Sequence, residues 1–281
     1  MNSLSQKAYA KINLTLDVTG VLPNGYHSLR TVMQTISLCD TVTVTLSGIH
    51  GIRIFCDEPG VPANECNTCY KAAKLFFEAV EEVDLGVDIH IEKNIPSMAG
   101  LGGGSADSAA VLRILNILLD KNMSADKLCK IAVKVGADVP FLINGGTALC
   151  EGVGEVLTPI SYDIKHNILL VKPDFGISTP LAYKSFDEKK LTSADMSKRL
   201  ISAIQNGEDI YRYLSNDLET AVADDKIISL KQEMLYYGAK ASMMTGSGSC
   251  VYGLFESEDD CLRALRILSG RYPFAHTCKT I

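Results

Sequence analysis

The sequence predicts an α+β protein built from two domains. Segments with the two-residue period of strands alternate along the chain with segments of helical period. The 281 residues contain no internal repeat or low-complexity tract, and 47% hydrophobic residues are enough for a sizeable core. Residues 151–155 (Glu-Gly-Val-Gly-Glu) interrupt the pattern, so we expect domains at 1–155 and 156–281.

The composition argues against several classes of protein. A formal net charge of −6 and a pI near 5.4 argue against nucleic-acid binding, which would show as a basic excess. No apolar run approaches the roughly 18 residues of a membrane span, and the first residues do not resemble a secretory signal. Nine scattered cysteines are typical of free thiols in a reducing compartment. We therefore expect a cytoplasmic protein without a membrane or nucleic-acid partner, and a homodimer stays open.

Strands are expected to open the chain. Residues 8–18 alternate in polarity, so Lys11 and Asn13 point to the same side of a strand. That side is either solvated or carries a cation and an amide for function. Residues 22–25 (Leu-Pro-Asn-Gly) are typical of a turn. Tyr26 and His27 follow it, where they either pack or contact a base, and 41–46 and 52–56 predict two further strands.

The next segments predict helices separated by a strand. Asn64 or Asn67 can cap a helix that runs to about residue 82, and residues 87–91 predict a strand that ends near Lys93. A later helix is expected between Ser124, its cap, and Gly136, its end.

Asp138 is predicted to lie at a junction between this helix and a strand. Pro140 should restrict Val139 to extended geometry, and residues 141–150 predict a hairpin. A carboxylate at such a junction either caps backbone N–H groups or takes part in chemistry.

The second half is expected to continue the α+β pattern. A loop containing Pro173 and Pro180 follows the first strand there. The predicted strands are 168–171, 242–245, 250–255 and 275–281, and the predicted helices are 196–206, 209–223, 226–237 and 258–268.

The most informative stretch is a glycine-rich loop that leads into a helix. Four glycines occur within residues 100–104, and apolar residues at helical spacing follow from Val111. The free N–H groups of the first turn and the helix dipole favour phosphate oxygens. Ser105 and Ser108 add hydroxyls that can cap the helix or reach a phosphate or its metal. The alternative is a flexible turn before a core helix.

This loop does not match the two standard nucleotide motifs. A dinucleotide-binding loop follows a strand directly and has an acidic residue about twenty positions later, whereas this loop follows Ile95-Pro96. The Walker motif requires Gly-Lys followed by Ser or Thr, and no lysine follows these glycines.

The loop resembles that of the GHMP small-molecule kinases, and six further blocks resemble the same family in order along nearly the whole chain. These blocks are Ala10-Lys11-Ile12-Asn13-Leu14, Gly25-Tyr26-His27, Gly136-Ala137-Asp138-Val139-Pro140, Glu151-Gly152-Val153-Gly154-Glu155, Asn216-Asp217-Leu218-Glu219 and Thr245-Gly246-Ser247-Gly248-Ser249-Cys250. The resemblance implies a two-domain GHMP kinase fold. Its first domain would be similar to the second domain of ribosomal protein S5 and its second ferredoxin-like, with the active site in the cleft between them.

The resemblance also assigns roles to residues, with ATP and Mg²⁺ as cofactors. Asp138 matches the general base and Lys11 the catalytic lysine. Those expected to bind ATP are Pro96, Met98, Ala99, Gly100, Leu101, Gly102, Gly103, Gly104, Ser105, Ala106 and Ser108, with Asn67 and Lys93 near the adenine. Ser105 or Ser108 is the candidate for a metal contact, and no other protein ligand for the metal is assigned.

A third set is expected to bind the acceptor. Tyr26 and His27 match positions that hold a cytosine ring in the family, and Tyr183 matches a position, often Phe in the family, on the other side of that ring. Met33 lies where an aromatic residue is common. Asn13, Gly246 and Ser247 complete the set.

The resemblance is closest to the branch of the family that phosphorylates the 2-hydroxyl of a cytidylyl methylerythritol, on the non-mevalonate route to isoprenoid precursors. Two alternatives stay open: a GHMP kinase acting on homoserine or a mevalonate-type alcohol, and a non-catalytic ligand sensor. Tyr26 and His27 favour the cytidylyl substrate, because the smaller alcohols have no base. The presence of both Lys11 and Asp138 favours an enzyme.

Overall fold

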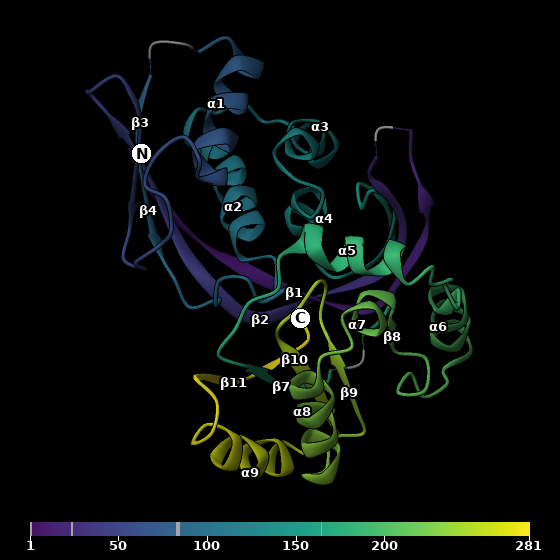
Figure 1. Cartoon of the computed structure of the whole chain (residues 1–281). Coiled ribbons are helices and arrows are strands. Elements are labelled where there is room, and N and C mark those ends of the chain that lie inside the picture. Colours follow the sequence, from purple (N-terminus) through teal and green to yellow (C-terminus); the bar gives the residue numbers. More distant parts are fainter. Residues whose placement is uncertain (1, 24, 83–84, 164) are drawn as a thin grey trace. The chain divides into compact units, whose positions relative to one another are not determined.

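Two long strands, β1 (Ser3–Val21) and β2 (His27–Ser47), contribute residues to both structural units of the chain (Figure 1). The computed structural model describes residues 2–23, 25–82, 85–163 and 165–281. Unit 1 consists of Met1–Ala10, Leu38–Ile95 and Gly102–Gly145, and unit 2 of Lys11–Ser37, Pro96–Leu101 and Gly146–Ile281. The predicted domain boundary at residue 155 stays a prediction.

Unit 1 combines strands with four helices. Strand β4 (Gly86–Glu92) pairs in parallel with β3 (Gly51–Cys56) and antiparallel with the second half of β2. The helices are α1 (Thr68–Val80), α2 (Gly103–Leu118), α3 (Ala125–Val135) and α4 (Val139–Asn144). Asn67 and Ser124 cap α1 and α3 through their side chains, as predicted. The strands predicted at 41–46, 52–56 and 87–91 are confirmed.

The hairpin predicted for residues 141–150 is wrong. Residues 139–144 form helix α4, and only Thr147–Gly152 form a strand, β5. Pro140 lies in the first turn of α4, where its missing N–H costs nothing and its fixed φ suits a helix, so Val139 is helical rather than extended. Asp138 consequently lies between two helices, at the N-cap of α4.

Unit 2 contains a four-stranded antiparallel sheet of ferredoxin-like topology. Its order is β11 (Phe274–Lys279), β7 (Asn167–Lys172), β10 (Val251–Phe255) and β9 (Ala241–Met244). Helices α8 (Asp225–Tyr236) and α9 (Glu258–Leu268) lie on one face of this sheet (Figure 1). Along the chain, this sheet and its two helices follow the order β7-α8-β9-β10-α9-β11, with residues 173–224 inserted between β7 and α8, which is the expected β-α-β-β-α-β arrangement.

The remaining strands of unit 2 extend the sheet that contains the second part of β1 and the first part of β2. Strand β5 pairs with β2 and with β6 (Val156–Pro159), and β8 (Ser215–Asn216) pairs in parallel with β1. The turn predicted at 22–25 includes Asn24, which lies outside the described residues. Helices α5 (Thr179–Glu188), α6 (Met196–Asn206) and α7 (Asp217–Val222) complete the unit.

Two predictions for this half are corrected. The segment around Pro180 is helix α5 rather than a loop, because the proline occupies the first helical turn. The helix predicted at 209–223 is limited to α7. Asn216 caps α7 by accepting a hydrogen bond from the N–H of Leu218, which fixes its start at Asp217.

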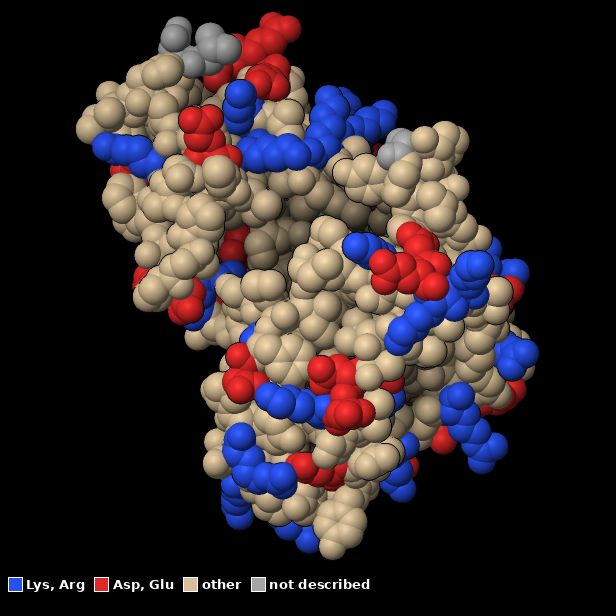
Figure 2. All heavy atoms as spheres, in the orientation of Figure 1, with Lys and Arg blue, Asp and Glu red and all other residues tan. Residues whose placement is uncertain are grey.

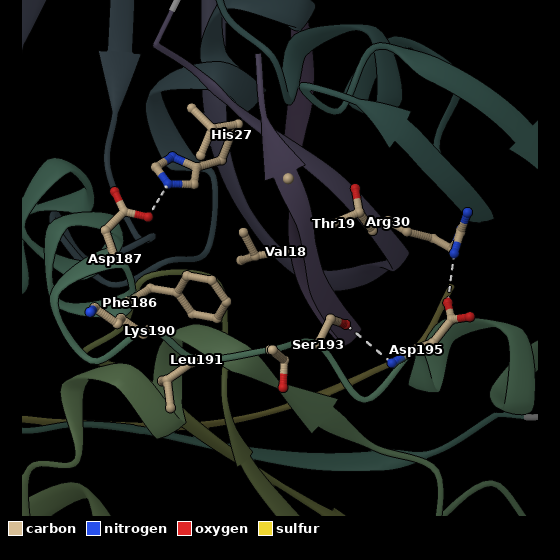
Figure 3. Close-up of a pocket in the computed structure, with 13 residues that line it drawn as sticks. Val18, Thr19, His27, Arg30, Phe186, Asp187, Lys190, Leu191, Ser193 and Asp195 are labelled. Carbon is tan, nitrogen blue, oxygen red and sulfur yellow. Dashed lines mark hydrogen bonds and ion pairs between the residues drawn. The ribbon is translucent and has the colours of Figure 1, made fainter.

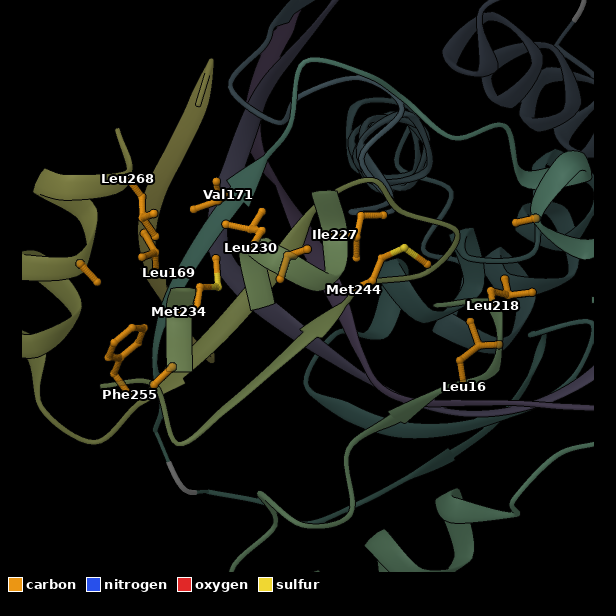
Figure 4. Packing of buried hydrophobic residues seen from close by; sticks show 14 of the residues in the cluster. Leu16, Leu169, Val171, Leu218, Ile227, Leu230, Met234, Met244, Phe255 and Leu268 are labelled. Carbon is orange, nitrogen blue, oxygen red and sulfur yellow. The ribbon is translucent and has the colours of Figure 1, made fainter. Parts of the chain in front are cut away.

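Buried apolar side chains connect the second sheet of unit 2 to its helices (Figure 4). Leu169 and Val171 of β7 lie in the same cluster as Leu230 of α8 and Leu268 of α9. Phe186 of α5 belongs to this cluster, so α5 is anchored by the core of the unit.

The cysteines are free thiols, as predicted. Within the described residues, every helix is too short or too polar to cross a bilayer.

Candidate active site

Lys11 and Asn13 lie on β1 inside unit 2. Lys11 is 4% exposed and Asn13 1%, so the solvated alternative is excluded for both side chains. Lys11 Nζ donates a hydrogen bond to Asn13 Oδ1 at 2.7 Å, and Asn13 Nδ2 donates to Thr31 Oγ1 at 2.8 Å. Because each group holds the next, the ammonium has a defined position.

Two loops pack around these residues. The N–H of Lys11 donates to the carbonyl of Leu101 at 3.0 Å, and Thr245 Oγ1 donates to the carbonyl of Gly100 at 3.2 Å. A Cβ on Gly246 would lie 3.4 Å from Lys11 Nζ. Met98 and Ala99 accept backbone hydrogen bonds from the 245–250 segment. The structure therefore brings together, around Lys11, predicted residues from sequence positions more than a hundred residues apart.

Ser247 lies in the second of these loops and links it to helix α5. Its side chain is buried and hydrogen-bonded to Thr179 Oγ1 at 2.9 Å, and Thr179 is the first residue of α5.

In unit 1, helix α2 begins in the glycine loop. Its N-cap is Gly102, with φ of 73°, and among the described residues no side chain caps this end. Ser108 is buried and donates to the carbonyl of Gly104 at 2.8 Å, whereas Ser105 is partly exposed. A Cβ on Gly136 would lie 3.9 Å from Ser105 Oγ, so the α3–α4 segment lies beside the start of α2.

Asp138 is the N-cap residue of α4, but within the described part of the chain its side chain makes no capping hydrogen bond to that helix. The structure therefore does not support Asp138 as a cap of α4.

Lys93 lies in a buried cluster with Asp40 and Asp107. Its Nζ donates to Asp107 Oδ2 at 2.7 Å and to Asp40 Oδ2, and all three side chains are at most 7% exposed. Asp40 Oδ1 also accepts the N–H of Ile95 at 2.8 Å. The cluster therefore fixes the point at which β4 leads into the glycine loop.

The charges of this cluster shift one another's pKa. Burial raises the pKa of Asp107 to about 7; Lys93 opposes this shift and Asp40 adds to it. Burial also opposes the charge on Lys93, but the two carboxylates outweigh it and raise the pKa of the lysine.

Asn67, the other residue expected near adenine, is 6% exposed, and its Oδ1 accepts the N–H of Cys69 at 2.8 Å. Lys93 thus has a structural role that the sequence did not indicate, whereas the contact of Asn67 is its predicted cap of α1.

The residues expected to hold a base lie in unit 2. Tyr26 is 66% exposed, whereas Met33 is buried on β2. The rings of His27 and Tyr183 stack with centroids 4.6 Å apart and planes 19° apart. His27 Nε2 lies 2.9 Å from Asp187 Oδ1.

A cavity of about 620 Å³ adjoins this pair, within unit 2. Val18, Phe186 and Leu191 supply apolar wall, and the His27–Asp187 and Arg30–Asp195 pairs lie on opposite sides of it (Figure 3). Sequence reasoning missed Asp187. Asp187 lies four residues after Tyr183, and on a helix this spacing would place both side chains on one face. The spacing is informative only if the segment is known to be helical.

Charged side chains of both signs are mixed over much of the face in Figure 2, while Lys and Arg side chains gather over α1 and α3 of unit 1. A protein with a net charge of −6 can therefore still present local positive charge.

Two family models match the chain, the GHMP kinases N terminal domain at residues 67–146 and the GHMP kinases C terminal domain at 200–273. The chain belongs to the GHMP kinases, which are ATP-dependent phosphotransferases.

The most informative relatives share one name. The chain is 42% identical over 279 residues to the 4-diphosphocytidyl-2-C-methyl-D-erythritol kinase of Clostridium tetani, covering 98% of this chain and 99% of that protein. It is 47% identical to the enzyme of the same name from Clostridium botulinum over 262 residues, covering 92% of each. The family membership predicted from the motifs is confirmed.

Solved structures of GHMP kinases are similar to this chain over nearly its whole length. A crystal structure of 4-(cytidine 5'-diphospho)-2C-methyl-D-erythritol kinase has a TM-score of 0.82 at 31% identity and covers 99% of both chains. Homoserine kinase from Cytophaga hutchinsonii has a TM-score of 0.80 at 18% identity, covering 100% of this chain and 95% of that one, which supports the fold alone.

Replacing Lys93 with Ala should lower the free energy of unfolding by about 3–5 kcal/mol, because two buried carboxylates lose their shared cation. Lys121→Ala is the control. Lys121 pairs with Glu82 at 2.9 Å, with side chains 27% and 41% exposed, so its loss should cost under about 1 kcal/mol. Urea denaturation measures both, and similar losses would contradict the buried cluster.

Replacing Gly100 with Ala should destabilise the protein more than Gly207→Ala does. The two glycines have nearly the same φ, +72° and +69°, so alanine is similarly strained at both, by roughly 1–2 kcal/mol. Only at Gly100 would the Cβ meet a backbone atom, the carbonyl oxygen of Thr245 at 2.0 Å, whereas Gly207 faces open space. We expect a further loss of about 1–3 kcal/mol at Gly100, measured by thermal unfolding. Equal losses would show that the loop is free to move away from Thr245.

Proposed function

We propose that this chain transfers the γ-phosphoryl group of ATP to the 2-hydroxyl of 4-diphosphocytidyl-2-C-methyl-D-erythritol. The observation that carries this proposal is the similarity, over almost the whole chain, to kinases named for that substrate. The buried Lys11–Asn13 pair and the His27–Tyr183 stack support it as well, because they are the residue types that this reaction and this substrate need.

The start of helix α2 is the proposed binding site for the ATP phosphates. Its first-turn N–H groups and the helix dipole favour anionic oxygens, and glycines at 102–104 let a ligand approach the backbone. Mg²⁺ bound with ATP supplies positive charge to the phosphate oxygens. We assign the protein contact with the metal to Ser105, since the hydroxyl of Ser108 is buried and already donates to Gly104.

In the proposed reaction, Asp138 accepts the proton of the 2-hydroxyl. The alcohol oxygen then forms a bond to the γ-phosphorus while the bond from that phosphorus to the β–γ bridging oxygen breaks, so that ADP leaves. Lys11 stabilises the negative charge that develops on the alcohol oxygen and on the transferred group. Its hydrogen bond to Asn13 keeps the ammonium oriented, so little reorganisation is needed.

The acceptor's cytosine is proposed to bind at Tyr26 and His27. An exposed aromatic ring can stack on a base, and an imidazole edge can form a hydrogen bond with it.

We also infer a cytoplasmic location, because free thiols persist in a reducing compartment. The cysteines of this chain are free thiols, and one of them, Cys66, is exposed.

A substrate panel tests the proposal directly. ADP release from ATP and Mg²⁺ is measured with the cytidylyl alcohol, homoserine, mevalonate or no acceptor. We expect turnover with the cytidylyl alcohol alone. Turnover of homoserine or mevalonate in its place would transfer the chain to another GHMP kinase activity, and binding without turnover would indicate a ligand sensor.

Replacing Asp138 with Asn should lower kcat by roughly 100-fold or more while leaving the Kd of ATP nearly unchanged, because the amide cannot accept the proton. Steady-state kinetics and nucleotide titration give the two values. Asp126→Asn, in the exposed first turn of α3, is the matched control and should keep the original kcat. Undiminished turnover in Asp138→Asn would remove this carboxylate from the chemistry.

A further inference from the structure

One helix holds the imidazole of His27 from two directions. Tyr183 and Asp187 are four residues apart on α5 and so share a face of that helix. Tyr183 stacks on the imidazole ring, and the Asp187 carboxylate lies 2.9 Å from Nε2. The side chain of His27 is 11% exposed and that of Asp187 is 50% exposed, so the imidazole is largely shielded from solvent while the carboxylate stays half-exposed.

Helix α5 is a firm support for this contact. Ala182 and Phe186, which precede Tyr183 and Asp187 in the chain, are 1% and 7% exposed and belong to the core cluster of unit 2. Thr179, at the start of the helix, is hydrogen-bonded to Ser247. The helix that carries Asp187 is therefore held by a hydrogen bond at its first residue and by core packing near its last.

The carboxylate determines which nitrogen of His27 carries a proton. A carboxylate only accepts hydrogen bonds, so Nε2 must be the N–H donor in this pair. In a neutral imidazole the other nitrogen, Nδ1, then has a lone pair and is an acceptor.

We propose that Asp187 is a specificity-determining positioning residue, which acts through His27 by presenting Nδ1 as an acceptor for the exocyclic amino group of cytosine. This rests on the proposed function, since it takes a cytidylyl alcohol as the acceptor. Cytosine has an N–H₂ donor where uracil has a carbonyl acceptor. Nδ1 can therefore accept a hydrogen bond from cytosine. Opposite uracil, the lone pair of Nδ1 would face a lone pair of the carbonyl oxygen, and no hydrogen bond would form.

The stack of Tyr183 on His27 leaves the edge of the imidazole ring accessible to a hydrogen bond. A hydrogen bond to Nδ1 lies in the plane of the imidazole, and that plane is 19° from the plane of Tyr183. The bound base can therefore reach Nδ1 without separating Tyr183 from His27.

The amide variant gives the sharpest test. In Asp187→Asn the side-chain amide can either accept from Nε2 or donate to it, so the tautomer is no longer fixed and Nδ1 can carry the proton as a donor. We measure kcat and KM for cytidylyl and uridylyl alcohols that differ only in the base.

The wild-type enzyme should prefer the cytidylyl alcohol by about 10- to 100-fold in kcat/KM. Asp187→Asn should raise its KM by about 10-fold and bring the ratio between the two substrates near one, with KM for ATP unchanged. Asp187→Glu, which keeps an acceptor, should recover part of the preference. Glu188→Gln, at a neighbouring carboxylate that is 66% exposed, should behave as wild type.

Three outcomes overturn the inference while leaving the proposed function intact: a wild-type enzyme without preference, an unchanged preference in Asp187→Asn, or the same loss in Glu188→Gln. A wild-type enzyme that fails to phosphorylate the cytidylyl alcohol overturns the proposed function itself. If Asp187→Asn does not fold, nitrogen NMR of His27 in the full wild-type chain decides. A proton on Nε2 supports the inference, and a neutral ring with the proton on Nδ1 overturns it.

Discussion

The burial of the Lys11 ammonium is the constraint on which much of unit 2 depends. A charge with 4% exposure is tolerated only when neighbouring groups accept its hydrogen bonds, and Asn13 Oδ1 at 2.7 Å is one of them. Asn13 is fixed in turn by Thr31 and Thr245. Glycines at 100 and 246 let two backbones come close to the same place. The hydrogen bonds that satisfy the ammonium also fix its position, which its proposed role in charge stabilisation requires.

In unit 1 the charge of a buried lysine is compensated by carboxylates rather than by an amide. Lys93 is paired with two carboxylates, and Asp40 uses its second oxygen to hold backbone N–H groups of Asn94 and Ile95. The pairing thus restrains the backbone immediately before the glycine loop. A glycine-rich loop has few side chains of its own for such restraint, so the restraint must come from neighbouring residues.

The sequence predicted elements with local start and stop signals and missed those that depend on packing. Asn67, Ser124 and Gly136 are such signals, and helices α1 and α3 were found from them. The sequence does not predict helices α4 and α5, because Pro140 indicates extended geometry for Val139 and Pro180 indicates a loop, although proline suits a first helical turn. The alternation around Lys11 and Asn13 gave their shared direction, but it could not show that both faces of β1 are buried in this region.

The missed helix explains why the recognition geometry could not be predicted from the sequence. Without α5, Tyr183 and Asp187 are two residues in a loop, and nothing relates either of them to His27, more than 150 positions earlier. On the helix, Tyr183 and Asp187 point to one side while Ala182 and Phe186 enter the core. A shift of α5 would therefore move the aromatic and the carboxylate together, preserving their mutual spacing. Discrimination between bases needs groups held within a fraction of an ångström, which a core-anchored helix provides better than a loop does.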